Sequence, residues 1–484
     1  MLMNRVYAGL EPNGHYPSLA ASAQAILHLT LDKAEQKADW MIGERLSDSQ
    51  IAYAALDAVI AYQLGTRLVE NLRQTGQFVA YQRMINTLPV VADAMLRGVP
   101  FDRNAHQALQ NCWRTQLSLA TSELNRELPD LNPDSSKQLA TWLEKHLPPE
   151  VKAGWERTDK GALKTGAEHW DVWPDAPKAL REYKRYQKLL STYGDDFAKQ
   201  IHPKTGRLHA DFNIAGTRSG RFSCHKPNLQ NPPRSPEFRR LFRPLDPNYR
   251  LVVADYSQIE LRIAALIADD RVMLEAFRNG QDLHRLTASL IAGVPMESVT
   301  SEMRSKAKAI AFGMLFGMGA AGLQKYATTS YGVIMSQEEA SRARNAFFNS
   351  YRGIKQWRER RQAIGRYDRT VTTAGGLVRD MSLEPKGWSL QQVLNTPIQG
   401  SAAEVLLEAL ARLPKALEGL DAHLIHHVHD EIILEVHNRD VEPAKSALTL
   451  AMVDAFESLF PDSGMAAYLV DAHDGPDWES AKTG

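Results

Sequence analysis

The pattern of hydrophobic positions divides the chain near residue 201. Before that point apolar residues recur mainly at helical spacing, most regularly over residues 46–72 (LSDSQIAYAALDAVIAYQLGTRLVENL), where Ser47 or Asp48 is a suitable N-cap. Two stretches rich in Pro, Gly and small polar residues interrupt this pattern. We expect this first part to be mostly helical, and residues 76–200 show no strand signal of any strength.

The later part of the chain alternates Pro- and Gly-rich loops with short β-branched runs and long helices. The runs 250–255 (RLVVAD) and 431–436 (EIILEV) predict buried strands. Asp255 ends the first run, before a turn and an amphipathic helix, and Asp430 precedes the second run in what should be a tight hairpin. This order predicts an α+β fold with a helical insertion.

Composition narrows the class of protein. A chain of 484 residues with 44% hydrophobic content should form two to four packed units. The apolar runs are too short to cross a bilayer, and no signal-peptide pattern is present, so we expect a soluble intracellular protein without a membrane partner. The two cysteines, Cys112 and Cys224, are far apart and lack a partner motif, which argues against disulfides and cysteine metal sites.

Charge alone indicates no nucleic-acid partner, because the formal net charge is zero. Two local stretches, 181–188 (REYKRYQK) and 355–369 (KQWRERRQAIGRYDR), interleave Lys and Arg with aromatic residues. Such stretches can bind backbone phosphates, although a solvated helix face is the commoner explanation for either one alone.

Asp255 and Asp430 are candidate metal ligands because both stand at the end of a predicted strand. If the two ends meet, carboxylates about 4 Å apart repel by roughly 4 kcal/mol at an effective dielectric constant of 20. A divalent cation would relieve this repulsion, and two Mg²⁺ ions held by two aspartates suit in-line phosphoryl transfer. Strand-end aspartates are also common turn formers, and Ser257 with Glu260 has the spacing of a capping box, so structural roles remain open.

The segment 304–323 (RSKAKAIAFGMLFGMGAAGL) predicts one helix with an unusual face. Four residues follow each other at four-residue steps: Arg304, Lys308, Phe312 and Phe316. The two cations could neutralise a polyphosphate while a ring lies against a base or sugar. Gly313 and Gly317 favour this hypothesis over a plain amphipathic helix, because each glycine costs a helix about 1 kcal/mol and permits close approach.

Six motifs together resemble the family A DNA polymerases of the bacterial DNA polymerase I type, over about residues 80–484. In order they are TRSGRFSCHKPNLQNPP, DYSQIELR, DLHR, RSKAKAIAFGMLFG, NTPIQGSAAE and HHVHDE. The resemblance implies a right-hand fold, with an antiparallel palm sheet and helical fingers and thumb. The implied parts are a thumb at 76–205, a palm at 206–270 and 390–484, and fingers at 271–389.

The resemblance also implies roles for individual residues. Two Mg²⁺ ions, with Mn²⁺ as a substitute, would be held by Asp255, the Tyr256 carbonyl, Asp430 and Glu431. Lys308 would act with the two aspartates in catalysis, as the acid toward pyrophosphate. The incoming dNTP would contact Arg304, Lys308, Phe312, His284, Gln258 and Glu260, the last as a gate against a ribose 2′-hydroxyl. Primer-template DNA would contact Thr217, Arg221, Asn228, Gln230, Asn231, Phe316, Asn395, Gln399 and His429.

The chain departs from the family pattern at three places in the polymerase region. Phe316 stands where the family usually has tyrosine, Gln391 where it has arginine, and GGLV (375–378) where many members have a Gly-Arg-Arg run. The first change keeps an aromatic ring and loses a hydroxyl group. We therefore expect it to affect template positioning and fidelity and to leave polymerisation itself intact.

Residues 1–75 resemble the last third of a DEDD-type 3′-5′ exonuclease domain. The stretch LDKAEQKADW precedes a Y-x-x-x-D motif formed by Tyr53 and Asp57, while the family's earlier acidic motifs would lie before Met1. One carboxylate cannot hold two metal ions. We therefore expect no proofreading from this chain.

Two other functions were weighed. A single-subunit RNA polymerase is disfavoured because Glu260 and Phe312 both indicate deoxynucleotides. A DNA-binding protein that lost the chemistry is disfavoured by the retained carboxylates and cations. We expect a monomer in the cytoplasm of a bacterial cell, or of a phage-infected host, with accessory replication proteins as possible partners.

The four histidines within 423–429 (HLIHHVH) suggest a zinc site at first sight. Strand alternation, however, should send His426 to the face opposite His427 and His429, which does not favour a closed tetrahedral set. Only His429 has an expected role, beside the primer end, and the other three should be packing or surface residues.

Overall fold

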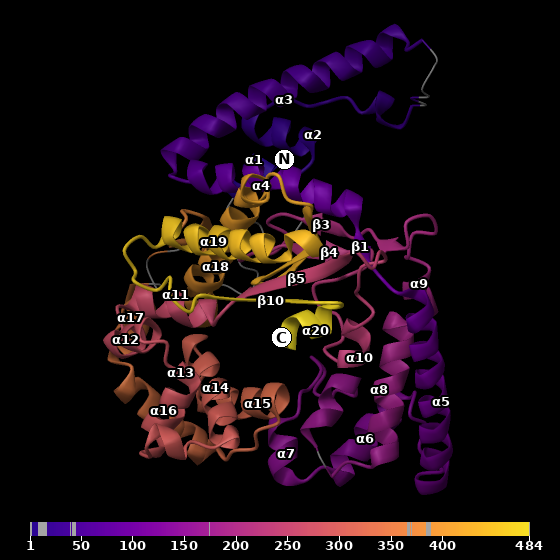
Figure 1. The fold of residues 1–484 in the computed structure, drawn as a ribbon, viewed down its shortest axis with the longest axis vertical. Coiled ribbons are helices and arrows are strands. Elements are labelled where there is room, and N and C mark those ends of the chain that lie inside the picture. Colours follow the sequence, from indigo (N-terminus) through magenta and orange to yellow (C-terminus); the bar gives the residue numbers. More distant parts are fainter. Residues whose placement is uncertain are drawn as a thin grey trace.

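The computed structural model of the chain describes residues 2–7, 17–38, 40, 45–173, 175–364, 368, 370–383 and 389–483. A four-stranded sheet lies in the middle of the molecule, with the N-terminal helices on one side and two mostly helical lobes on the other (Figure 1). The basic stretch 355–369 and the exonuclease-like stretch 31–40 lie partly outside the described residues. No described helix is long and apolar enough to cross a membrane.

The central sheet is antiparallel, with strand order β10-β5-β9-β8. Its strands are β5 (Tyr249–Tyr256), β8 (Ala422–Val428), β9 (Glu431–His437) and β10 (Val470–Gly475). Both strands expected from the β-branched runs are therefore confirmed. They are buried on both faces, which explains why each run is continuously apolar.

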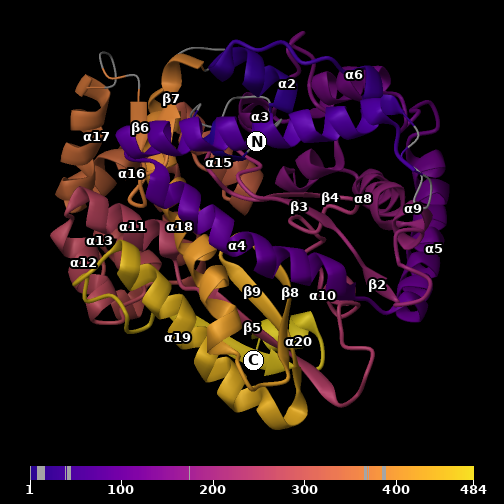
Figure 2. The same cartoon turned by 90° about the horizontal axis from the view of Figure 1, so that it is seen from above.

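Alternate residues of β5 face two different cores. Val252 and Ala254 join the large core with α4 (Phe78–Arg97), α18 (Leu390–Ala416) and α19 (Val441–Leu459). Leu251 and Val253 join a second core that includes Trp478 of α20 (Trp478–Thr483). Figure 2 shows α4, α18 and α19 on the same side of these strands. The sheet is thus held from both faces, which fixes its strand ends.

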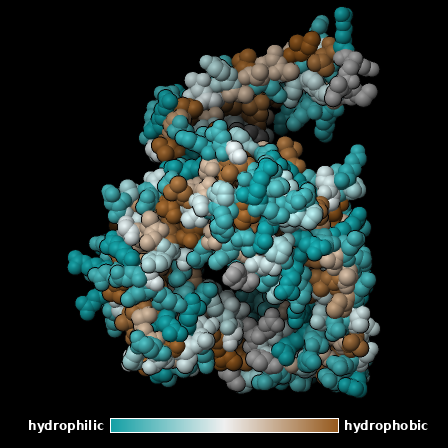
Figure 3. Space-filling view, in the orientation of Figure 1, coloured by the Kyte–Doolittle hydropathy of each residue, from teal (hydrophilic) through white to brown (hydrophobic). Residues whose placement is uncertain are grey.

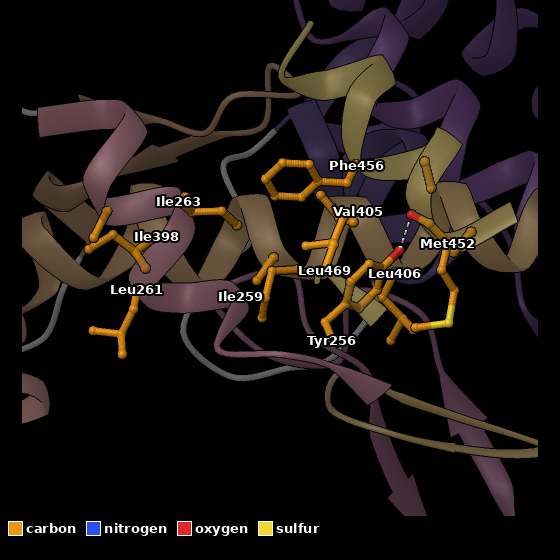
Figure 4. Packing of buried hydrophobic residues seen from close by; sticks show 14 of the residues in the cluster. Tyr256, Ile259, Leu261, Ile263, Ile398, Val405, Leu406, Met452, Phe456 and Leu469 are labelled. Atoms are coloured by element: carbon orange, nitrogen blue, oxygen red, sulfur yellow. Dashed lines mark hydrogen bonds between the residues drawn. The ribbon is translucent and has the colours of Figure 1, made fainter. Parts of the chain in front are cut away.

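Tyr256 anchors the end of β5 in the large core. Its ring is 1% exposed and packs with Ile259, Leu406 and Met452 (Figure 4). Its hydroxyl group donates a hydrogen bond of 2.8 Å to the Met452 carbonyl oxygen. A buried, hydrogen-bonded tyrosine leaves the backbone at this strand end little freedom.

The region expected to be the thumb, residues 76–205, contains two packing units. Its long helices α5 (Arg103–Glu127) and α8 (Lys178–Tyr193) lie along each other. The shorter helices of this lobe are α6 (Ser136–His146), α7 (Pro149–Gly154) and α9 (Asp195–Ala198). A separate tryptophan-rich core fills the tip of the lobe. Helix α4, by contrast, packs on α18 and β8.

Residues 76–200 contain one short strand for which the sequence showed no signal. Strand β1 (Val99–Pro100) pairs with β2 (Arg207–Leu208), beyond the end of the thumb region. Two residues are too few to give an alternating pattern, so the sequence carried no signal for this pairing.

The region expected to be the fingers, residues 271–389, is mostly helical. Its helices are α12 (Arg271–Arg278), α13 (Leu283–Ala292), α14 (Ser301–Leu315), α15 (Ala320–Tyr331), α16 (Gln337–Ser350) and α17 (Arg352–Ile364), followed by the short hairpin β6 (Thr370–Thr372) and β7 (Val378–Asp380). Helix α11 (Ile259–Ala268) joins this region to the sheet.

The single helix expected over residues 304–323 was wrong, because α14 ends at Leu315. Gly317 has a φ of +77°, and its N–H donates to the Met314 carbonyl while Met318 N–H donates to that of Gly313. This pair of bonds is a Schellman motif, which ends a helix. A Cβ on Gly313 would lie 2.8 Å from Leu323 Cδ1 of α15. The fold itself therefore accounts for both glycines, whereas the sequence had suggested that they permit the approach of a ligand.

The tips of the two lobes touch. Helix α15 contacts α7 and the 3₁₀ turn Ala167–Val172. Lys325 Nζ lies 3.7 Å from Glu156 Oε1, and Lys164 Nζ lies 2.7 Å from the other oxygen of the same carboxylate. Figure 3 shows the molecule hollowed between the lobes, beneath the sheet. This hollow is bounded by the sheet, both lobes and the contact between their tips.

The N-terminal region is helical, as expected. Its α-helices are α1 (Leu2–Tyr7), α2 (Leu19–Ser22) and α3 (Asp48–Gln74). Ser47 is the N-cap of α3 and forms a capping box with Gln50, which confirms the first of the two expected caps. After burial, the nearby carboxylates of Asp57 and Asp32 help to raise the pKa of the Tyr53 hydroxyl group.

Candidate active site

Strand pairing brings Asp255 and Asp430 together at one edge of the sheet. Asp255 of β5 stands opposite Glu431 of β9, and Asp430 occupies the two-residue turn between β8 and β9. The Tyr256 N–H donates a hydrogen bond of 3.2 Å to the Asp430 carbonyl oxygen. The expected meeting of the two strand ends therefore occurs.

Negative charge accumulates at this edge. Burial, the charge of Asp255 and that of Glu260 raise the pKa of Asp430 to about 7. Burial also raises the pKa of Asp255, although the nearby Lys482 opposes this shift. Oxygen ligands with unrelieved mutual repulsion suit a hard divalent cation such as Mg²⁺. Asp255 and Asp430, together with the anchored backbone of Tyr256, therefore fit a Mg²⁺ site.

Glu431 is arranged differently from the two aspartates. Its carboxylate is 4% exposed and accepts hydrogen bonds from Trp478 Nε1 and Lys482 Nζ of α20. Lys482 Nζ also lies 3.6 Å from Asp255 Oδ2. Within the described residues no group of three or more acidic, histidine or cysteine side chains is arranged to hold a metal ion. Glu431 is thus held by the C-terminal helix, beside the aspartate pair.

The backbone next to each aspartate is left-handed. Gln258 has a φ of +56° and His429 a φ of +57°, a conformation that costs energy for residues other than glycine. The Gln258 side-chain oxygen is buried without a hydrogen-bond partner. Such geometry is concentrated at functional sites. Here His429 directly precedes Asp430, and Gln258 follows Asp255 by three residues.

The capping-box hypothesis for Ser257 and Glu260 was wrong. The N-cap of α11 is Gln258, and no side chain caps this helix end. Glu260 instead forms an ion pair with Arg221, and 16% of its side chain is exposed. The Glu260 carboxylate therefore does not cap α11 and is bound instead by the loop that carries Arg221.

Four of the six expected nucleotide-binding residues lie on α13 and α14, while Gln258 and Glu260 lie at the start of α11. His284 is 3% exposed, its ring centroid is 6.0 Å from that of Phe312, and Lys308 lies close by. Burial and the charges of Lys308 and Arg304 lower the pKa of His284 to about 4. This histidine is therefore neutral at physiological pH. The Phe312 ring also lies 6.0 Å from that of Phe316, the C-cap residue of α14.

The expected DNA contacts lie on five segments of the chain: the turn between β3 (Asp211–Asn213) and β4 (Ser223–His225), the loop at 228–231, the C-terminal end of α14 with Phe316, α18, and the β8–β9 turn. Thr217 and Arg221 close the turn between β3 and β4, where the Thr217 hydroxyl donates to the Arg221 carbonyl. Asn395 and Gln399 lie one turn apart on α18. His429 is exposed in the β8–β9 turn.

The loop of Asn228, Gln230 and Asn231 is tied to its surroundings. Gln230 is 7% exposed, and its Nε2 donates a bond of 2.7 Å to the His427 carbonyl oxygen. Its backbone N–H donates a hydrogen bond of 3.0 Å to Asn228 Oδ1. Asn231 is exposed, and its carbonyl oxygen accepts from the Tyr193 hydroxyl. Gln230 thus anchors the loop, and Asn231 presents its side chain to solvent.

The four histidines of residues 423–429 lie in different surroundings. His426 and His427 are 1% and 2% exposed and pack against Phe212, while His423 pairs with Asp421. The strand-alternation argument did not apply to His429, because β8 ends at Val428 and His429 is in the turn. A register shift between Leu424 and His426 interrupts the alternation as well.

The GGLV loop is held in place by buried contacts. The Glu404 carboxylate is 1% exposed and accepts hydrogen bonds from the N–H groups of Gly375 and Leu377. Arg83 Nη1 donates to the Gly375 carbonyl oxygen at 2.9 Å. A Cβ on Gly375 would lie 2.5 Å from both Arg83 and Glu404. The other departure, Gln391, lies beside Gly317 at the end of α14.

Two residues near the site were missed from the sequence. Arg234 lies close enough to His429 to help lower its pKa, after burial and Arg221. It directly follows NLQNPP, so a cation next to that motif could have been noticed. Lys482 contacts Glu431 and Asp255 from the last described helix, and no local pattern pointed to it.

Comparison with known proteins identifies the family. Residues 103–480 match DNA polymerase family A, and residues 9–73 match a 3′-5′ exonuclease family. DNA polymerase I of Rhizobium leguminosarum is 32% identical over 458 residues, which cover 90% of this chain and 44% of that protein. DNA polymerase I of Aquifex aeolicus is 31% identical over 453 residues, which cover 89% of this chain and 76% of that protein.

The fold agrees with these relatives. A structure described as the POL domain of Pol1 from M. smegmatis in complex with DNA primer-template and dNTP matches with a TM-score of 0.83 and 25% identity, covering 99% of this chain and 82% of that chain. The expected right-hand fold is thereby confirmed. The chain spans less than half the length of the R. leguminosarum relative. This chain belongs to DNA polymerase family A.

Proposed function

We propose that this chain is a template-directed, primer-dependent DNA polymerase, which adds dNMP to a primer 3′-hydroxyl group and releases pyrophosphate. The observation that carries the proposal is the meeting of Asp255 and Asp430 at one sheet edge. Family membership and the likeness to a polymerase bound to primer-template and dNTP support it. The hollow between the lobes gives primer-template DNA a place beside this edge.

Asp255, Asp430 and the Tyr256 carbonyl are the groups that we propose to hold two Mg²⁺ ions, which Mn²⁺ can replace. When bound, such ions activate the attacking oxygen and stabilise the leaving group. The buried core under Tyr256 keeps these ligands in place without substrate. Glu431, which is hydrogen-bonded to Trp478 and Lys482 of α20, would lie beside Asp255 and Asp430 and add negative charge to the site.

Cations on α14 act on the triphosphate in this proposal. Arg304 and Lys308 lie one turn apart, so both side chains can face the same anion. Lys308 would donate its proton to the departing pyrophosphate, while neutral His284 would contact phosphate as a hydrogen-bond donor. Phe312 would lie against the nucleotide, and the Arg221-paired carboxylate of Glu260 would exclude a 2′-hydroxyl group.

Primer extension tests the proposal. Asp430→Asn should lower the extension rate at least a hundredfold, because one of two charged ligands is lost. Asp474→Asn is the matched control, since Asp474 lies on β10 of the same sheet and pairs with Arg250 and Lys445. Chelation with EDTA should stop extension, and added Mn²⁺ should restore it. A wild-type rate for Asp430→Asn would overturn the assignment.

We place the reaction in a bacterial cytoplasm or a phage-infected cell, with the chain acting as a monomer. Sedimentation at working concentration, with and without a primer-template, checks the monomer. Accessory replication proteins would be sought as factors that lengthen the product of each binding event.

A further inference from the structure

Asp282, in the DLHR motif, uses its two carboxylate oxygens for different purposes. Oδ1 accepts hydrogen bonds from the N–H groups of His284 and Arg285, at 3.0 and 3.1 Å, and so caps α13. Oδ2 accepts a hydrogen bond of 2.6 Å from Arg304 Nε, across the gap to α14. One side chain therefore links the start of α13 to the first turns of α14.

The bond to Nε orients Arg304 and leaves its outer nitrogens available. A guanidinium group has five N–H donors, of which Nε carries one and the two Nη groups carry four. Among the described residues, no other protein group is recorded in a hydrogen bond with this guanidinium. Its side chain remains 43% exposed. The planar group is thus fixed at its stem and open at its outer end.

The open end belongs to a cluster that suits phosphate. Lys308 follows one turn later on α14, and the charges of Lys308 and Arg304 both act on His284. His284 Nδ1 is buried without a hydrogen-bond partner. Two cations and an unpartnered imidazole nitrogen therefore lie close together, beside the negative charge of Asp282. Asp282 is itself ionised, because the bonds from Arg304 and Arg285 outweigh burial and lower its pKa.

We propose that Asp282 is a positioning residue for the nucleotide, which holds the Arg304 guanidinium by Nε so that its Nη groups face the triphosphate. This inference rests on the proposed function of the same site. A free arginine side chain loses rotamer entropy when it is fixed. Because Asp282 fixes Arg304 before the nucleotide arrives, dNTP binding does not bear that cost in full.

A double-mutant cycle separates this role from helix capping. Asp282→Asn and Asp282→Ser both retain good N-cap residues, so α13 should keep its cap while Arg304 loses its charged partner. Either variant should raise the KM for dNTP about three- to tenfold, with kcat changed less. In an Arg304→Ala background the same substitutions should change KM less than twofold, because the oriented group is already missing.

A second measurement needs no polymerase activity. Binding of tripolyphosphate, followed by calorimetry at low salt, should weaken about three- to tenfold in Asp282→Asn and should not weaken further in Asp282→Asn/Arg304→Ala than in Arg304→Ala. If wild type binds tripolyphosphate with this coupling and extends no primer, the proposed function fails while the inference stands. An unchanged affinity and KM in Asp282→Asn, or equal losses in both backgrounds, would overturn the inference.

Discussion

Replacing His427 should reduce the acid sensitivity of the central sheet. His427 is 2% exposed, and its ring lies 4.3 Å from that of Phe222 and 4.7 Å from that of Phe212. Both of its ring nitrogens are buried without hydrogen-bond partners. Burial, together with the charges of His426 and His429, lowers its pKa to about 3. His427 is therefore held neutral in the folded protein.

The change in the free energy of unfolding with pH follows, in sign and in size, from the linkage between protonation and folding. In the unfolded chain a histidine has a pKa of about 6.5, so the unfolded state takes up a proton below that pH while folded His427 does not. The lowered folded pKa thus contributes stability that is present above pH 6.5 and is lost as the pH falls. Between pH 8 and pH 5 the loss is roughly 2 kcal/mol for this one residue.

Thermal unfolding of His427→Phe and wild type at pH 8 and pH 5 checks this value. For a cooperative unit of 150 to 250 residues, roughly 2 kcal/mol corresponds to about 4 to 8 °C in Tm, so the variant should lose that much less on acidification. Packing changes act at both pH values and cancel in the difference. Phe222→Leu, a packing change at the same place, should leave the acid-induced difference intact. An equal drop in Tm for His427→Phe and wild type would refute the reasoning.

Three further outcomes are expected. Glu260→Ala should raise incorporation of rNTPs relative to dNTPs at least tenfold, measured by single-nucleotide extension, and an unchanged ratio would exclude Glu260 as the gate. Gly375→Ala should destabilise the fold by about 1 to 3 kcal/mol in chemical unfolding, because its Cβ would lie 2.5 Å from Arg83 and Glu404; a neutral effect would show that the loop can move. Single-stranded DNA with Mg²⁺ and no dNTP should stay undegraded, and digestion that Asp57→Ala abolishes would contradict the absence of proofreading.

The strands and the acidic turn could be predicted because their signals are local. A continuous apolar run marks a buried strand, and Asp430 before EIILEV marks the turn of a hairpin. Which strands pair is not a local property, so periodicity alone could not place Asp255 opposite Glu431. That step came from the resemblance to a family of known fold.

Long-range partners explain most of what the sequence could not give. Lys482 reaches Glu431, and Glu404 binds the loop at Gly375, only because the fold brings distant segments together. The break after Leu315 is a different case. A glycine at a helix end and a glycine inside a helix look alike in a pattern, and only the φ of Gly317 distinguishes them.

The ion pair between Glu156 and Lys325 makes the protein a ring around its hollow. The sheet joins both lobes, and the pair joins their tips, so the path around the hollow is closed. A primer-template in the hollow would then be enclosed on all sides for as long as the lobe tips stay in contact. Because Lys325 and Glu156 remain partly exposed, salt weakens their attraction. A higher ionic strength should therefore open this contact more often, and with it one side of the hollow.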